Sequence, residues 1–210
     1  MCGWRLFLMT LCYKRRSPIY GVGINDADYQ TQGANIKPCT FYRKWKHMLE
    51  RCYSEYMLNR RPTYRGTTVC EEWHTFSNFK SWMEKQDWED NHLDKDILSE
   101  SKEYSPETCI FVPRKVNSFV VSAQKIRGDY LVGVSVWKER PEFYVACCNN
   151  PFTGKMDKLG RYSDELTAHR VWKAKKLEHL KILQVKYNLT EPVVEGIIRV
   201  INNHEINYQQ

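Results

Sequence analysis

One short segment, His92–Leu98, gathers several residue types that could do chemistry. Asp94 and Asp96 alternate there with Lys95, and His92 comes two residues before Asp94. Carboxylate oxygens are ligands for hard divalent cations, and a histidine can accept a proton near neutral pH. Charged side chains also form the usual outer face of a strand. The pattern alone leaves a metal site and a solvated strand as open alternatives.

Eight cysteines are a second set of reactive side chains. They include no C-x-x-C pair, so the spacing gives no support to a zinc ribbon. Disulfides belong to oxidising compartments, and without a clear secretory signal we expect reduced, mostly buried thiols. A scattered four-cysteine site made of Cys39, Cys52, Cys70 and Cys109 is the alternative.

Composition and charge narrow the class of protein. The 210 residues are 42% hydrophobic, which can form a core and excludes a disordered or collagen-like chain. No run of about 18 apolar residues exists, so we expect no membrane span. Of the net charge of +7, residues 40–120 contribute none, whereas residues 127–187 carry twelve basic and seven acidic side chains. Basic segments bind phosphates, so nucleic acid is the first partner to consider, with a solvated basic face as the alternative.

The elements around the reactive segment follow from periodicity. Residues 17–39 have the composition of a loop. Thr40 can cap a helix whose apolar residues recur at helical spacing as far as Tyr56. A short strand is predicted over Thr67–Cys70, and a second helix over residues 75–86.

A strand, a loop, a returning strand and a short helix are predicted within residues 92–122. Alternation predicts the first strand over residues 93–98, and Cys109–Val112 is the returning strand. Pro113 suits the start of a helix that continues to about Ser122.

A three-stranded antiparallel meander is predicted next, because turn signals separate Leu131–Trp137, Glu142–Cys148 and Lys155–Tyr162. Ser163 can cap the helix that follows. Its apolar face contains Ala168, Trp172, Leu180, Leu183 and Tyr187, with Lys176 as the exception. That face can cover one side of the sheet, which leaves the other side free to enter a DNA major groove.

The two ends of the chain carry weaker signals. Thr190 can cap a last amphipathic helix, which we expect to pack on the core in preference to forming a dimer contact. The apolar stretch Leu6–Tyr13 is short for a signal peptide, so we interpret it as part of an N-terminal extension, with a weak signal peptide as the alternative.

Several segments have a recognisable order and spacing. They are Gly21–Ala27, Tyr42–Tyr53, Val69–Trp73, Phe76–Phe79, Leu93–Leu98, Tyr104–Cys109 and Val116-Asn117. Together they closely resemble the HNH-type (His-Me finger) endonucleases of tailed bacteriophages, over roughly residues 20–190.

A second set of segments lies in the meander and its helix. They are Gly133–Ser135, Phe143–Cys148, Leu159–Tyr162 and Ala168–Arg170. This set is similar to the APETALA-two (ethylene-response-factor) DNA-binding domain, which lays a three-stranded sheet in the major groove. Phage homing endonucleases often combine that domain with an HNH nuclease.

The HNH resemblance implies a strand–strand–helix finger that holds one divalent metal, Mg²⁺ or Mn²⁺. Asp94 matches the metal-binding acid and Asn117 the second ligand. Lys95 stands where the family's usual histidine would be, and a lysine is cationic at neutral pH. Three alternatives follow: His92 acts as the base, Lys95 holds phosphate while a water on the metal reacts, or the site has decayed.

Other candidates complete the expected site. His74 is a weaker candidate base, and Asp96 is expected to be a solvated carboxylate. The expected DNA contacts are Lys138, Arg140, Lys155, Lys158 and Arg161, together with Trp137 and Tyr144, for which stacking on DNA and packing within the protein are the two alternatives.

The sequence therefore predicts an α+β protein with an HNH-like metal finger and a three-stranded sheet packed on one helix. Its expected parts are an extension and loop (1–39), a nuclease module (40–122), a DNA-binding module (127–187) and a helical tail (188–210). The expected function is a phage-encoded endonuclease acting on double-stranded DNA in the cytoplasm of the infected bacterium. It would need no organic cofactor and no membrane, with a monomer as the expected state. The alternatives are a catalytically decayed DNA-binding protein and a phage protein-interaction module.

Overall fold

The structure is a computed structural model that describes residues 17–34, 36–120 and 130–206. It has mixed α+β architecture with small sheets, as expected. The chain divides into two compact units, Met1–Arg65 with Glu71–Lys80, and Gly66–Cys70 with Ser81–Gln210. The predicted extension over Leu6–Tyr13 and the predicted helix end at Ser122 lie outside the described residues. Within the described part, no helix has the length and apolar content of a membrane span.

The first unit is built on helices. Its elements are α1 (Thr40–Tyr53), α2 (Glu55–Arg60), the 3₁₀ turns Pro62–Tyr64 and Glu71–His74, and the start of α3 (Phe76–Met83). The apolar face of α1 is buried as predicted, and Trp45 Nε1 donates a hydrogen bond to the Trp73 carbonyl at 2.7 Å. Gly23 of the preceding loop lies against Trp45 and Leu49, where a Cβ would overlap both side chains.

The predicted bounds of α1 are wrong at both ends. Thr40 is the first helical residue and Cys39 is the N-cap, whose side chain makes no cap hydrogen bond. The helix ends at Tyr53 because Ser54 takes an extended backbone, and Tyr56 belongs to the separate helix α2. Apolar spacing specifies a helical face, but it does not detect a one-residue break.

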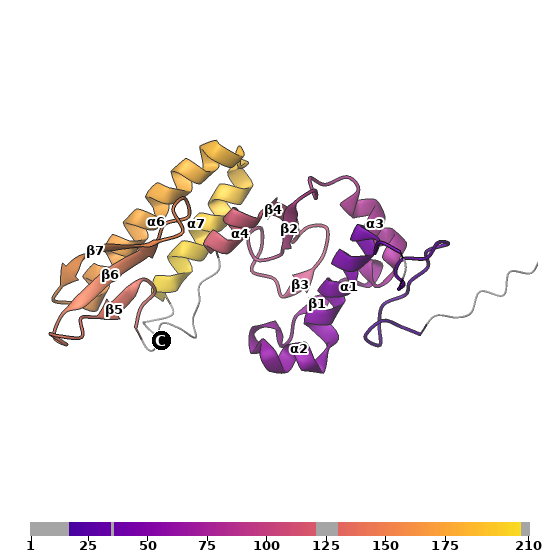
Figure 1. The fold of residues 1–210 in the computed structure, drawn as a ribbon, viewed down its shortest axis with the longest axis horizontal. Coiled ribbons are helices and arrows are strands. Elements are labelled where there is room, and N and C mark those ends of the chain that lie inside the picture. The colour runs from indigo at the N-terminus through magenta and orange to yellow at the C-terminus, as the bar shows by residue number, and fades with distance from the viewer. Residues whose placement is uncertain (1–16, 35, 121–129, 207–210) are drawn as a thin grey trace, which may run out of the picture. The chain divides into compact units, whose positions relative to one another are not determined.

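Two pairs of short strands begin the second unit (Figure 1). Strand β1 (Thr68–Val69) pairs in parallel with β3 (Glu103–Tyr104). Strand β2 (Asn91–Asp94) pairs antiparallel with β4 (Ile110–Pro113), and α4 (Arg114–Val120) follows β4 directly. The predicted succession of strand, loop, strand and helix is thereby confirmed.

A three-stranded antiparallel sheet forms the next part of this unit, as predicted. Its order is β5 (Val134–Val136), β6 (Tyr144–Asn149) and β7 (Met156–Tyr162). Helix α6 (Glu165–Tyr187) covers one side of the sheet (Figure 1). Strand β5 is shorter than predicted because residues 131–133 form a turn in which Gly133 has a φ of 79°.

The cap of α6 also differs from the prediction. Asp164 is the N-cap, and its carboxylate accepts a hydrogen bond from the Thr167 amide at 2.7 Å. The predicted cap, Ser163, lies one residue too early. Both residue types cap helices well, so composition alone does not choose between adjacent candidates.

The last helix, α7 (Glu191–Ile206), packs in cis, as predicted. Its buried residues Val193, Ile197 and Ile201 share one apolar cluster with Ile97, and this cluster also includes buried residues of α4 and α6. Because α7 packs against both α4 and α6, it joins the β2–β4–α4 segment to the part of the unit that carries the sheet.

Candidate active site and nucleic-acid face

The site begins with two polar side chains that the β2–β4–α4 segment brings together. Asp94 is the last residue of β2, and Asn117 is the fourth residue of α4. Asn117 Nδ2 donates to Asp94 Oδ2 at 3.4 Å. In the antiparallel pairing of β2 with β4, Asp94 lies opposite Ile110. The chain therefore passes beside Asp94 shortly before α4 begins. Local pairing therefore positions both predicted metal ligands.

Hydrogen bonds to the other carboxylate oxygen of Asp94 turn the chain and so end strand β2. Asp94 Oδ1 accepts hydrogen bonds from the amides of Asp96 at 2.8 Å and Ile97 at 3.0 Å. The prediction of a strand over residues 93–98 is therefore wrong beyond Asp94, where the chain turns. The physical reason is that an aspartate carboxylate competes with a sheet for nearby backbone amides.

Burial changes the ionisation of Asp94. Loss of solvent raises the pKa of this carboxyl above its ordinary value, and the hydrogen bonds from the Asp96 and Ile97 amides oppose that rise. A desolvated carboxylate is stabilised by a cation close to it. A positive ion held at the Asp94 carboxylate would therefore oppose the rise in its pKa.

His92 and Lys95 differ in their surroundings. His92 is exposed and lies two residues before Asp94, so alternation along β2 gives the two side chains the same face. The Lys95 side chain is only 8% exposed, and its Nζ lies 2.5 Å from Asp96 Oδ1. It also lies 5.9 Å from the centre of the Tyr104 ring. Lys95 is thus already engaged by a carboxylate and an aromatic ring.

Asp96 and His74, the remaining predicted residues of the site, have other side chains as neighbours. Asp96 has a 63% exposed side chain, as expected for a solvated carboxylate, but it pairs with Lys95. His74 belongs to the first unit, where its Nε2 lies 3.5 Å from the Tyr53 hydroxyl. Among the described residues, no group of three or more His, Cys, Asp or Glu side chains could hold a metal ion.

The loop between β3 and β4 is held by its own side chains. Thr108 Oγ1 donates to the Glu103 carbonyl at 2.7 Å and accepts from the Ser105 amide at 3.0 Å. Cys109 follows this loop, and burial raises the pKa of its thiol to about 12. Cys109 is therefore a protonated core residue at neutral pH and no nucleophile.

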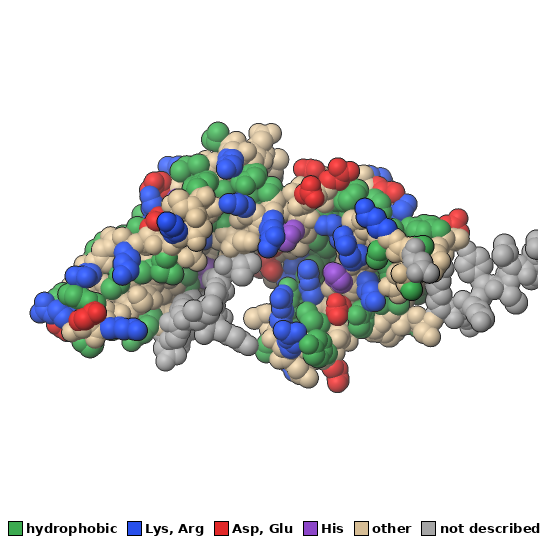
Figure 2. Space-filling model, viewed as in Figure 1, with side chains coloured by type: hydrophobic (Ala, Val, Ile, Leu, Met, Phe, Trp, Pro, Cys, Tyr) green, Lys and Arg blue, Asp and Glu red, His purple; other side chains and the backbone are tan. Residues whose placement is uncertain are grey.

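The free side of the sheet carries arginine and aromatic side chains. The Arg161 guanidinium lies 3.6 Å from the centre of the Trp137 ring. The Arg140 guanidinium lies 5.1 Å from the Phe143 ring and pairs with Glu142 at 3.1 Å. Figure 2 shows Lys and Arg side chains around this sheet, at the left of the view. The exposed basic residues predicted as DNA contacts are Lys138, Arg140, Lys155, Lys158 and Arg161.

Tyr144 does not belong to this face. It lies opposite Tyr162 in the sheet, and both rings pack against the cluster that includes Ala146 and Ala168 of α6. Strand alternation turns the Tyr144 side chain toward the helix, so of the two expected roles, stacking on DNA and packing, the structure shows the packing.

Comparisons with known proteins found no match: neither a family model, nor a curated protein, nor a solved structure matches this chain.

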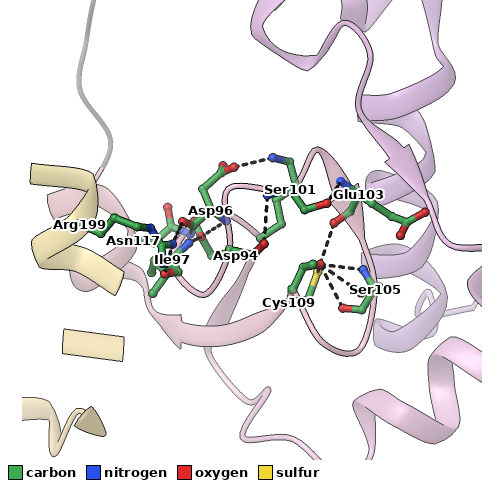
Figure 3. A network of polar contacts seen from close by, with 12 residues as sticks. Asp94, Asp96, Ile97, Ser101, Glu103, Ser105, Cys109, Asn117 and Arg199 are labelled. Carbon is green, nitrogen blue, oxygen red and sulfur yellow. Dashed lines mark hydrogen bonds and ion pairs between the residues drawn. The ribbon is translucent and has the colours of Figure 1, made fainter. Parts of the chain in front are cut away.

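Sequence reasoning missed two residues of α7 that lie at the candidate site. Arg199 Nη2 donates to the carbonyl oxygens of Asp96 at 3.2 Å and Ile97 at 2.9 Å (Figure 3). Gly196 lies so close to the Ile97 carbonyl that a Cβ would overlap it. A glycine on the apolar side of a predicted helix is a signal of close approach, but sequence does not name the partner.

Proposed function

We propose that this protein is a phage-encoded DNA endonuclease that hydrolyses phosphodiester bonds with one divalent metal ion. The observation that carries the proposal is the convergence of Asp94 and Asn117 at the end of β2 and on α4. We interpret β2, β4 and α4 as an HNH-like finger, in agreement with the resemblance of the sequence.

The donor set suits a hard cation. Asp94 offers a carboxylate and Asn117 an amide oxygen, which are ligands that Mg²⁺ and Mn²⁺ prefer over the Cys and His sites of Zn²⁺. The desolvated Asp94 carboxylate supports the fit, because a cation bound there would oppose the rise in its pKa, and Lys95, the neighbouring cation, pairs with Asp96. When bound there, the ion would stabilise the charge that develops on the leaving oxygen.

His92 is the residue that we assign as general base. It shares a face of β2 with Asp94, and an exposed neutral imidazole can take a proton from an attacking water. Lys95 is assigned no proton transfer, since its ammonium already donates to Asp96.

Double-stranded DNA is the proposed substrate, and the cytoplasm of an infected bacterium is the proposed place of action. The free side of the β5–β7 sheet supports this, because the exposed residues Arg161 and Arg140 lie over the Trp137 ring, and Lys158 is exposed as well. Arginine and lysine in such positions bind phosphates first and read bases second. We propose that a monomer acts without an organic cofactor.

A second candidate is a DNA-binding protein whose catalytic site has decayed. Its specific support is Lys95, which occupies the position of the usual histidine and is buried against Asp96. In that case the sheet would bind DNA and the finger would remain as a scaffold.

Cleavage of supercoiled plasmid tests the proposal directly. The wild type is expected to nick the plasmid with Mg²⁺ or Mn²⁺ and to be inactive with EDTA. Asp94→Ala is expected to lower the nicking rate at least about 100-fold, since even residues that only support metal ligands are worth about 10- to 100-fold. Its binding of DNA should be unchanged, because the sheet is separate from the Asp94 side chain.

The matched control is Asp87→Ala, which removes an exposed aspartate seven residues earlier in the same unit. Asp87→Ala should nick at the wild-type rate. Salt-sensitive DNA binding without metal-dependent nicking would reject the nuclease in favour of the decayed site. Absence of DNA binding would reject both in favour of a protein-interaction module.

A further inference from the structure

The turn that holds Asp94 is fixed from its other side by α7. The peptide group between Asp96 and Ile97 forms hydrogen bonds with both Asp94 and Arg199. Its N–H, from Ile97, donates to Asp94 Oδ1 at 3.0 Å. Its C=O, from Asp96, accepts from Arg199 Nη2 at 3.2 Å. Figure 3 shows Asp94, Asp96, Ile97 and Arg199 in this arrangement.

The Ile97 carbonyl adds a second hydrogen bond between the turn and Arg199. Arg199 Nη2 also donates to the Ile97 oxygen at 2.9 Å. A cation on the carbonyl side of a peptide polarises its N–H, so the bond from that N–H to the Asp94 carboxylate becomes stronger. Charge-assisted hydrogen bonds of this kind are shorter and stronger than neutral ones.

Packing makes the position of Arg199 specific. Gly196, three residues earlier on α7, allows the helix to approach the Ile97 carbonyl without a Cβ between them. The Ile97 side chain is fully buried among Val193 and Ile197 of the same helix. The turn is therefore held by apolar packing as well as by Arg199.

We infer that Arg199 is a positioning residue for the divalent ion. Arg199 holds the Asp94 turn, so that backbone amides fix one carboxylate oxygen of Asp94 and the other oxygen faces Asn117. This inference rests on the proposed function for the ion, but the restraint of the turn is separate from it. The C-terminal helix thereby becomes part of the active site.

Two measurements on the full-length protein test the inference. The first is hydrogen exchange of the Asp96 and Ile97 amides without metal. The second is Mn²⁺ binding followed by electron paramagnetic resonance, with Asp94→Asn as the variant that must lose the ion. In Arg199→Met we expect faster exchange at both amides and an Mn²⁺ Kd raised by about 10- to 100-fold, as for other residues that orient metal ligands.

Glu100→Ala is the matched control. Glu100 Oε1 lies 3.8 Å from Arg199 Nε and 2.5 Å from Asn203 Nδ2, so this variant removes surface pairs of α7 and leaves both carbonyl bonds in place. It should exchange and bind Mn²⁺ as the wild type does. If Arg199→Met is not folded at the assay temperature, Arg199→Lys replaces it, because it keeps the stem and charge but loses the planar donor group.

The outcomes are distinguishable. Unchanged exchange in the Arg199 variant overturns the inference, and so does faster exchange with unchanged Mn²⁺ affinity. Equal effects in Glu100→Ala overturn it as well, because they would show a general loosening of α7. If the wild type binds no Mn²⁺, the proposed function fails, while the exchange result still decides whether Arg199 holds the turn.

Discussion

Asn117 Nδ2 lies 3.4 Å from Asp94 Oδ2, although 23 residues separate the two in the sequence. The antiparallel pairing of β2 with β4, followed directly by α4, brings them together. The contact makes a place in the second unit where a carboxylate and an amide could share a ligand.

His92→Ala should separate proton transfer from metal binding. Because His92 is assigned as the base and holds no metal, we expect nicking to fall by about 100-fold or more while Mn²⁺ affinity is unchanged. The measurement is single-turnover nicking of plasmid beside an Mn²⁺ titration. His47→Ala, which removes an exposed histidine of α1, is the control. Wild-type nicking by His92→Ala would assign the base elsewhere.

Arg161→Gln should weaken DNA binding through lost phosphate contact. Arg161 is exposed and lies over Trp137 on the free side of the sheet. Each phosphate contact contributes about 0.9 to the slope of log K against log salt, so we expect the slope to fall by about that amount. Fluorescence anisotropy at several salt concentrations measures it. Lys181→Gln, which changes an exposed residue of α6, should keep the wild-type slope.

Gly133→Ala should destabilise the sheet more than Gly154→Ala does. Both glycines have positive φ, 79° and 71°, so each substitution strains the backbone by about 1–3 kcal/mol. A Cβ at Gly133 would also overlap the Trp172 side chain, whereas Gly154 has open space around it. Overpacking adds about 1–3 kcal/mol. Urea unfolding compares the two, and equal losses would contradict the close approach of Gly133 to Trp172.

Lys176 should make stability depend on pH. Its Nζ donates to the Phe119 carbonyl at 2.6 Å, and burial lowers its pKa from 10.5 to about 8. Between about pH 8 and the unfolded pKa of about 10.4, the unfolded state binds more protons. This residue therefore contributes a rise in unfolding free energy with pH across that window.

The test compares the wild type with Lys176→Met by urea unfolding at pH 7, 9 and 10. The stability of the wild type relative to the variant should increase with pH, with a slope approaching about 1.4 kcal/mol per pH unit. The comparison is needed because the raised pKa values of Cys109 and Cys148 act in the opposite direction in both proteins. A constant difference would mean that Lys176 titrates as a solvated lysine.

Much of the fold could be predicted because its signals are local. Turn residues separated the three strands of the meander, and apolar spacing identified the buried faces of α1 and α6. The exact starts and ends could not be predicted, as Ser54, Asp94 and Asp164 illustrate. At each of them a single residue or side chain decides whether the regular hydrogen bonding continues.

The candidate site was predictable only in part. The resemblance indicates Asp94 and Asn117 as a pair, and the structure brings them into contact. The burial of Lys95 against Asp96 and the inward turn of Tyr144 were not predicted, because a charged or aromatic residue type does not specify which way its side chain faces.

The sequence by itself determined the α+β class, the order of elements and the candidate residues, since these depend on spacing along the chain. Only the tertiary structure decided that Arg199 and Gly196 of α7 meet the Asp94 turn. It alone also decided that Lys176 is buried against Phe119. Such contacts join residues that are 57 to 103 positions apart, and their formation depends on how whole elements pack.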